Sequence, residues 1–402
     1  MKTKETFLRI AIVDRFPYNN WYSCSLGKAL SRTLKGKGVV FLYAPKNSTP
    51  KRAGYCIYRC VWSPHLYPIQ IIKQAIRDKV KIIHIQFEFI TFGGFYTSIL
   101  MLPLIALLRL LKVKVVVTLH GPIFPKDSSE EIINSLRPAS VKIPTSLLAF
   151  CIILFYKLIS VLSSKIIVHA KVFQKWLFDY GIDNCMVIPH GVELINPTNS
   201  YYRKEELLNR SNEVILFFGV LTPRKGLETL LQAFSIVVKQ INNVMLVIAG
   251  DEPSYYRGYK DKLIKMAEEL KINNRTVFLG KVSDDLVPDL FKMASVIVLP
   301  YLFSISASGP MSLAMAYGKP IIASETEFFK EMLGNQCSSL LFPLKDYKLL
   351  ARKIIEILSN RKYAKQISRE IRNMAVKFSW ERIALLTLKL YERLSREVTK
   401  NG

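Results

Sequence analysis

Short runs of consecutive apolar residues recur along this 402-residue chain, and most of them are followed by a stretch of helical periodicity. Runs rich in Val and Ile, without polar alternation, are typical of strands buried on both faces of a parallel sheet that helices cover. The expected strands are Leu8–Val13, Val39–Tyr43, Tyr55–Val61, Lys81–Phe87, Val113–Leu119, Lys165–Val168, Met186–Ile188, Val214–Phe218, Val244–Ala249, Thr276–Leu279, Val296–Leu299 and Pro320–Ala323.

The alternation stops once, at the polar stretch Asn196–Asn212, and then restarts. The length of the chain also fits two domains. We therefore predict two doubly wound α/β domains, with ligands bound beyond the carboxyl ends of the strands, in the cleft between the domains. The first helix after the restart is expected to bury one face, formed by Leu227, Leu230, Leu231, Phe234 and Val238.

The net charge of +26 favours an anionic partner: a nucleic acid, a membrane surface or a phosphorylated ligand. The sequence holds no RNP motif, zinc knuckle or base-reading basic helix, so we expect no nucleic-acid partner. The six cysteines form neither a CxxC motif nor a cluster with histidines, which predicts buried free thiols in a reducing compartment. The start, MKTKETFLRIAIVDRF, resembles a first strand and not a signal peptide.

Two segments approach the hydropathy of membrane helices, Ser98–Leu111 and Thr145–Leu162. Pro103 and Arg109 interrupt the first, and strand-like residues follow each of them directly. A spanning helix needs about 20 apolar residues, so we expect no membrane span. Two interpretations stay open: helices buried against a sheet, or helices that lie on a membrane surface with nearby Lys and Arg on the lipid head groups.

One helix N-terminus directly follows an expected strand, in SISASGPMSLAMAYGKPII (Ser304 to Ile322). Ser308 suits the N-cap, Pro310 the first turn and Gly318 the C-cap. Such an N-terminus favours an anion, because its N–H groups are free and the helix dipole is positive there.

Two cations lie at another strand end. Arg224 and Lys225 follow the glycine turn of ILFFGVLTPRKGLETLLQAF, at a helix start, where a positive charge is unfavourable unless an anion binds. The strands in LVIAGDEP and VFLGKVSDD also end in glycine turns, at Gly250 and Gly280. The glycine turns, the two cations and the helix N-terminus predict a diphosphate site at the carboxyl edge of the second sheet.

These segments, with ASVIVLPY and the closing FSWERIALLTLKLYERL, resemble the nucleotide-sugar half of glycosyltransferase family 4, whose members are retaining enzymes with the GT-B fold. VVVTLHGP, SSKIIVHA and VIPHGVE resemble markers of its first domain and linker. The resemblance implies two Rossmann-like domains that face a cleft. Residues 1–190 would bind the acceptor and carry membrane-facing helices, residues 191–377 would bind the nucleotide sugar, and residues 378–402 would cross back as a helix.

Position by position, the resemblance assigns Lys225 and Arg224 to the donor diphosphate, where they would stabilise the leaving group, and Gly219 to a close approach of the backbone. The family usually has an arginine near the place of Val220, for which Arg224 would substitute.

Further donor contacts are implied around the same edge. Lys281 and Val282, beside the glycine turn, lie where the base is held, and Ser308 and Gly309 lie where helix N–H groups meet the phosphates. His120 matches the first-domain histidine near the transferred sugar.

The chain departs from the family pattern at two further positions. The family usually has two glutamates eight residues apart, whereas this chain has Ile305 and Leu313, which resembles a branch without the pair. Recognition of the sugar would then fall to other groups, and Asp251, Glu252 and Ser306 are the candidates.

Candidates for acceptor binding are Asn19, Asn20 and Trp21, in the family's first loop, and Glu88, just past an expected strand. The resemblance implies a retaining hexosyltransferase that needs no cofactor and no metal ion. The basic first domain and its apolar helices favour a lipid-linked oligosaccharide, a glycolipid or a growing glycan as acceptor, at the cytoplasmic face of an anionic inner membrane. The alternatives are a soluble acceptor, or a non-catalytic homologue that acts as a partner subunit.

Overall fold

The computed structural model describes residues 7–15, 21–48, 56–89, 91–122, 144–195 and 213–400. The chain divides into two compact units, each with its own sheet. The first unit holds the residues up to Gly191, the short segment Ile305–Ala307 and the chain from Trp380 onward. The second unit holds Val192–Ser304 and Ser308–Ser379. Both units are Rossmann-like, each with helices around a parallel sheet.

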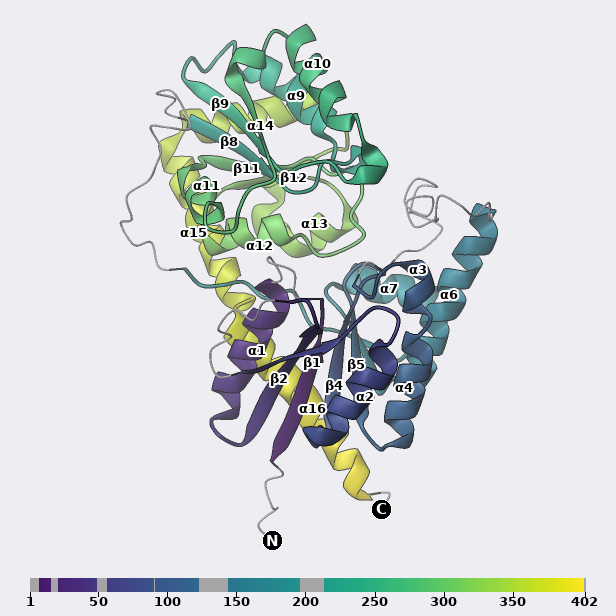
Figure 1. Ribbon diagram of the computed structural model, residues 1–402. Helices are drawn as coiled ribbons and strands as arrows, with labels where there is room; N and C mark the ends of the chain where they lie inside the picture. Colours follow the sequence, from purple (N-terminus) through teal and green to yellow (C-terminus); the bar gives the residue numbers. More distant parts are fainter. Residues whose placement is uncertain are drawn as a thin grey trace. The chain divides into compact units, whose positions relative to one another are not determined.

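The first unit is built on a seven-stranded sheet in the order β3-β2-β1-β4-β5-β6-β7, with every neighbouring pair parallel (Figure 1). Every residue of the central strand β4 is buried, as expected for a strand covered on both faces. The strands are β1 (Leu8–Val13), β2 (Gly38–Pro45), β3 (Ile57–Trp62), β4 (Ile82–Phe87), β5 (Lys114–Leu119), β6 (Lys165–Val168) and β7 (Cys185–Val187).

Helices cover both faces of this sheet. On one face, α1 (Trp21–Leu34) and α16 (Trp380–Lys400) pack against each other over a core that includes Ile10, Ile12 and Leu42. On the other face, three helices lie side by side in one row (Figure 1): α2 (Tyr67–Arg77), α4 (Met101–Leu110) and α6 (Thr145–Leu162). The shorter helices of the unit are α3 (Phe95–Ser98) and α7 (Lys171–Asp179).

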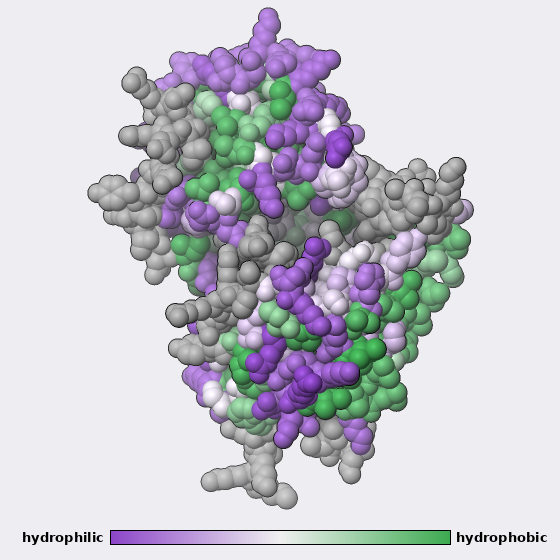
Figure 2. Space-filling view, viewed as in Figure 1, coloured by the Kyte–Doolittle hydropathy of each residue, from purple (hydrophilic) through white to green (hydrophobic). Residues whose placement is uncertain are grey.

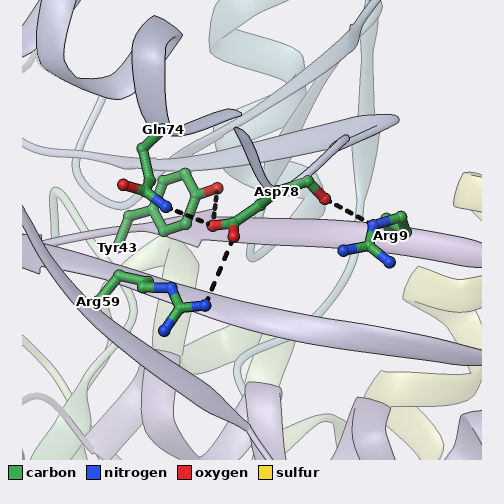
Figure 3. Close-up of polar contacts among 5 residues, drawn as sticks. All are labelled: Arg9, Tyr43, Arg59, Gln74 and Asp78. Carbon is green, nitrogen blue, oxygen red and sulfur yellow. Dashed lines mark hydrogen bonds and ion pairs between the residues drawn. The ribbon is translucent and has the colours of Figure 1, made fainter. Parts of the chain in front are cut away.

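The buried carboxylate of Asp78, at the end of α2, bonds to side chains of the sheet (Figure 3). Asp78 accepts hydrogen bonds from Tyr43 Oη (2.7 Å) and Gln74 Nε2 (2.9 Å), and its Oδ1 lies 3.5 Å from Arg59 Nη2. Arg9 Nε donates to its backbone carbonyl at 2.5 Å. These partners offset the desolvation of the carboxylate, so Asp78 adds no exposed negative charge beside α2.

The second unit is built on a six-stranded parallel sheet in the order β10-β9-β8-β11-β12-β13 (Figure 1). Its strands are β8 (Glu213–Phe218), β9 (Val244–Ala249), β10 (Thr276–Gly280), β11 (Val296–Leu299), β12 (Ile321–Ser324) and β13 (Leu341–Phe342). Its α-helices are α9 (Leu227–Val237), α10 (Tyr259–Glu269), α11 (Val287–Met293), α12 (Gly309–Ala316), α13 (Glu327–Leu333), α14 (Tyr347–Ser359) and α15 (Arg361–Lys377). Four short 3₁₀ helices also lie here: η1 (Pro223–Lys225), η2 (Ser254–Tyr256), η3 (Asn273–Arg275) and η4 (Asn335–Leu340).

All expected strands are present, with small shifts at their ends, and β13 was not predicted. The face predicted for α9 is confirmed at its first four positions, but Val238 is wrong: the helix ends before it, and Val237 is buried instead. The prediction of buried thiols is wrong for Cys60 and Cys151, which are exposed, although all six cysteines are free.

The two apolar segments form α3 with α4, and α6. Within the described ranges, no helix combines the length and the hydropathy that a membrane span requires.

Candidate functional site

Three glycine turns lie next to one another at the carboxyl ends of β8, β9 and β10. Gly219 N–H donates to the Ala249 carbonyl (2.9 Å), and Gly250 N–H donates to the Gly280 carbonyl (2.8 Å). All three glycines have positive φ, and a Cβ on Gly250 would lie 1.8 Å from the Gly219 carbonyl oxygen. Side chains are therefore excluded from this part of the edge, which leaves main chain open to a close approach by a ligand.

The turn that carries the two cations is held against the loop after β11. Gly226 ends the 3₁₀ turn η1 with φ 67°, and a Cβ there would lie 2.0 Å from the Pro300 carbonyl oxygen. Leu302 N–H donates to the Arg224 carbonyl at 2.8 Å. These two contacts fix the backbone on either side of Lys225.

Lys225 is buried, with 8% of its surface exposed. Its Nζ lies 3.5 Å from the centroid of the Tyr301 ring, a cation–π contact. Within the described part of the chain, no hydrogen bond or ion pair reaches this Nζ. Burial, and then the nearby Arg224, hold the pKa of Lys225 well below its usual 10.5. A buried ammonium without a counter-ion is costly, and a bound anion would offset that cost.

The predicted N-terminus of α12 is confirmed. Ser308 Oγ accepts the Met311 N–H at 3.3 Å, and Pro310 lies in the first turn. The predicted C-cap is displaced by one residue, because Tyr317 is the cap and Gly318 follows it with φ 59°.

Tyr301 contacts both features of the predicted anion site, and the sequence analysis did not single it out. The face of its ring lies against Lys225, and its hydroxyl lies 3.4 Å from Ser308 Oγ. The Ser324 hydroxyl donates to the Tyr301 carbonyl. One aromatic side chain thus connects the buried cation to the N-cap of α12.

The remaining candidates for donor binding have different surroundings. The Glu252 carboxylate caps the start of α10: it accepts the N–H groups of Gly258 (2.8 Å) and Lys260 (2.7 Å), and these bonds lower its pKa. Asp251 lies 3.7 Å from the Lys260 ammonium. Glu252 therefore performs the capping that its turn requires, and a contact with the sugar would come in addition.

Lys281 is exposed and Val282 is half-buried, both just past β10. Ser306 lies in the loop between β11 and α12, within the segment Ile305–Ala307 that groups with the first unit.

In the first unit, the half-buried His120 belongs to a chain of hydrogen bonds with buried polar groups. Its Nδ1 lies 3.2 Å from His169 Nε2, and its Nε2 lies 2.8 Å from the side-chain oxygen assigned to Gln86. His169 Nδ1 lies 2.9 Å from the Ile188 carbonyl. Both ring nitrogens of His120 therefore have partners within the first unit.

The carbonyl of Ile188 fixes the protons along this chain. It can only accept, so His169 carries its proton on Nδ1 and accepts at Nε2 from His120 Nδ1–H. Burial lowers the pKa of His169 to about 3 and that of His120 well below its usual 6.5, so both rings are neutral. His120 Nε2 is then an acceptor, which requires the Gln86 amide to present its NH₂ group. This orientation also supplies the partner that Gln86 Nε2 lacks among the described residues.

The acceptor candidates are only partly described. Glu88 is exposed and lies directly after β4. Trp21 is the first residue of α1, but its side chain lies outside the described part, as do Asn19 and Asn20 altogether.

Most of the second unit matches a known family model. Residues 199–374 match the family model described as glycosyl transferases group 1. A phosphatidyl-myo-inositol mannosyltransferase of Mycolicibacterium smegmatis is 26% identical over 226 residues, which are 55% of each chain. The chain spans about half the length of the first curated relatives it matches.

Solved structures share the fold over nearly the whole chain. Sucrose-phosphate synthase of Thermosynechococcus elongatus superposes with a TM-score of 0.74 at 19% identity, covering 97% of this chain and 100% of that one. Anabaena HepE, solved with UDP and glucose, gives 0.71 at 15% identity, covering 96% and 100%. Most of the second unit thus matches the group 1 glycosyltransferase model, and the chain as a whole shares the GT-B fold of these solved structures.

Proposed function

We propose that this protein transfers a hexose from a nucleotide-diphosphate sugar to an acceptor hydroxyl, with retention of anomeric configuration. The observation that carries the proposal is the buried ammonium of Lys225, which has no counter-ion among the described residues and follows the glycine turn at the end of β8. A diphosphate supplies that counter-ion. Anabaena HepE, which shares the fold, was solved with UDP.

In this proposal the second unit stabilises the leaving group. As the bond from the sugar to the diphosphate breaks, Lys225, Arg224 and the N-terminus of α12 offset the negative charge that grows on the β-phosphate. Groups fixed before the reaction act strongly, and a single such donor contributes about 3–4 kcal/mol of transition-state stabilisation. The proposal assigns no step to a protein nucleophile, a cofactor or a metal ion.

His120 is proposed to orient the transferred sugar. Its ring is half-buried, so part of it stays accessible, while His169 and Gln86 fix its orientation and its neutral state. Ser306 and Glu252 remain the proposed substitutes for the absent pair of glutamates, and Glu88, Asn19, Asn20 and Trp21 are the proposed contacts of the acceptor.

The acceptor is proposed to be a lipid-linked oligosaccharide, a glycolipid or a growing glycan at the cytoplasmic face of an anionic membrane. The basic first domain favours this class, and one relative is named for transfer to phosphatidyl-myo-inositol. A soluble acceptor is the alternative within the same activity.

The test is turnover with UDP-, GDP- and ADP-linked glucose and mannose, each with phosphatidylinositol or diacylglycerol in vesicles, or with free hexoses. We expect acceptor-dependent release of one nucleoside diphosphate, an α-linked product from an α-linked donor, and at least a hundredfold lower rate in Lys225→Met. A β-linked product would refute retention. A donor that binds without turnover on any acceptor would favour the non-catalytic partner subunit.

A further inference from the structure

An apolar surface extends over the row of helices α2, α4 and α6. Large apolar side chains point outward from all three helices, and two are exposed to an unusual degree: Leu110 is 77% exposed and Val161 is 71% exposed. We call this surface the three-helix face. It consists of eleven exposed side chains: Leu66, Ile69, Ile76, Leu107, Leu110, Leu111, Leu147, Phe150, Leu154, Leu158 and Val161.

The three-helix face is continuous and not a scatter of single side chains. The helices pack in sequence, α2 on α4 and α4 on α6, and Arg109 Nη1 donates to the Val161 carbonyl at 2.7 Å across the last pair. Figure 2 shows the result as a green area at the lower right of the view, over α4 and α6. Contiguous apolar surface of this kind marks an interaction site.

Among the described residues, the exposed charges on and beside the helices of this face are positive. Exposed cations lie on α2 (Lys73, Arg77), on α4 (Arg109) and on α6 (Lys157). Two more, Lys79 and Lys112, lie two residues beyond the ends of α2 and α4. Among the described residues from 56 to 178, the acidic side chains are Asp78 and Glu88. Asp78 is buried and bonded to Arg59, Tyr43 and Gln74, so the surface beside α2 is uniformly basic.

We propose that the three-helix face is the surface by which the protein docks on a bilayer that contains anionic lipids. The apolar side chains would enter the boundary between head groups and acyl chains, and the flanking cations would bind lipid phosphates. This inference deepens the proposed function, since it names the surface that brings the first unit to a membrane-bound acceptor.

A second copy of this chain fits the same face less well. A symmetric dimer places the same patch of both copies together, so the cations that flank the face would oppose one another. A bilayer with anionic lipids supplies both the apolar layer and the negative charge that the face lacks.

The test is co-sedimentation with vesicles of phosphatidylcholine alone or with phosphatidylglycerol added. We expect binding that requires phosphatidylglycerol and weakens as salt is raised. Leu110→Glu and Val161→Glu should each weaken binding at least tenfold. The matched control is Leu385→Glu, at an exposed leucine on α16 of the same unit, and it should bind as the original protein does.

A second pair of variants tests the cations without a risk to folding. Lys79 and Lys112 have φ values of 50° and 59°, a conformation that glycine adopts more readily than lysine. Lys79→Gly and Lys112→Gly should therefore keep the fold, and each should weaken vesicle binding about fivefold.

Two results would overturn this inference. One is equal vesicle binding by Leu110→Glu and the Leu385→Glu control. The other is a dimer in sedimentation velocity that Leu110→Glu abolishes, which would make a second copy the occupant. UDP binding without vesicles, measured on each variant, separates this failure from that of the proposed function, because Lys225 and the glycine turns do not belong to the three-helix face.

Discussion

Replacing Lys225 by methionine should abolish donor binding and change how the stability of the free protein depends on pH. Methionine keeps the length of the side chain but removes an ammonium that burial and Arg224 destabilise. The cation–π contact with Tyr301 is lost as well, which opposes the gain by about 0.5–2 kcal/mol. The change in the free energy of unfolding caused by Lys225→Met is therefore set by how far the pKa of Lys225 is lowered. The pH dependence of that free energy measures this lowering.

The sign of the pH dependence follows from linkage. Between the lowered pKa of Lys225 and its usual 10.5, the unfolded chain binds a proton that the folded protein does not, so stability rises with pH across this window. Within this window, each pH unit changes the free energy of unfolding by up to about 1.4 kcal/mol. Lys225→Met should remove this slope.

Donor binding should show the linked effect. A diphosphate beside Lys225 restores its proton, so binding takes up a proton, and the Kd for UDP should rise with pH, up to about tenfold per unit. Urea unfolding at several pH values gives the stability, and calorimetry in buffers of different ionisation enthalpy counts the protons. The control is Lys239→Met, at an exposed lysine of the same unit. The reasoning fails if the original protein and Lys225→Met have the same pH slopes in both experiments.

Three further predictions concern the groups that position the site. Tyr301→Phe keeps the ring under Lys225 and should leave the Kd for UDP within about twofold, whereas Tyr301→Leu should raise it by a factor of about 2–30 in titration calorimetry. Gly250→Ala should lower the free energy of unfolding by more than about 2 kcal/mol, because its Cβ would overlap a neighbouring carbonyl, whereas Gly258→Ala, with positive φ but open space, should cost about 1 kcal/mol. An equal loss of unfolding free energy in the two variants would contradict the predicted overlap at Gly250. ¹⁵N NMR at pH 7 should show neutral His120 with its proton on Nδ1, and His169→Phe should abolish that preference; an imidazolium signal in the original protein would refute the proton assignment.

The sequence predicted the fold well because its strongest signal, continuous apolar strands between helices, reports burial on both faces of a parallel sheet. β13 was not predicted because it consists of two residues, Leu341 and Phe342, which are too few to show a periodicity. The exposure of the apolar side chains of α2 was not predicted for another reason. In the sequence, Ile69 and Ile76 resemble core positions, and only the packing of the neighbouring helices shows that they point outward.

The candidate site was predicted as a set of residue types but not as a set of contacts. Positive φ at Gly219, Gly250 and Gly280 follows from their turns, whereas the hydrogen bonds that join the three depend on strand order. The approach of His120 to His169 has the same origin, because β5 and β6 are neighbours whose carboxyl ends meet. Strand order is a property of tertiary packing, and a local motif does not contain it.

The most direct test of the account is the thermal unfolding of the original protein and of Lys225→Met with UDP-, GDP- and ADP-sugars. The account predicts that one nucleotide stabilises the original protein, by about 2.7 kcal/mol at a hundred times its Kd, and that this shift disappears in Lys225→Met. A shift of equal size in both proteins would contradict the assignment of the diphosphate to Lys225. No shift with any of the nucleotide sugars would contradict the proposed donor class itself.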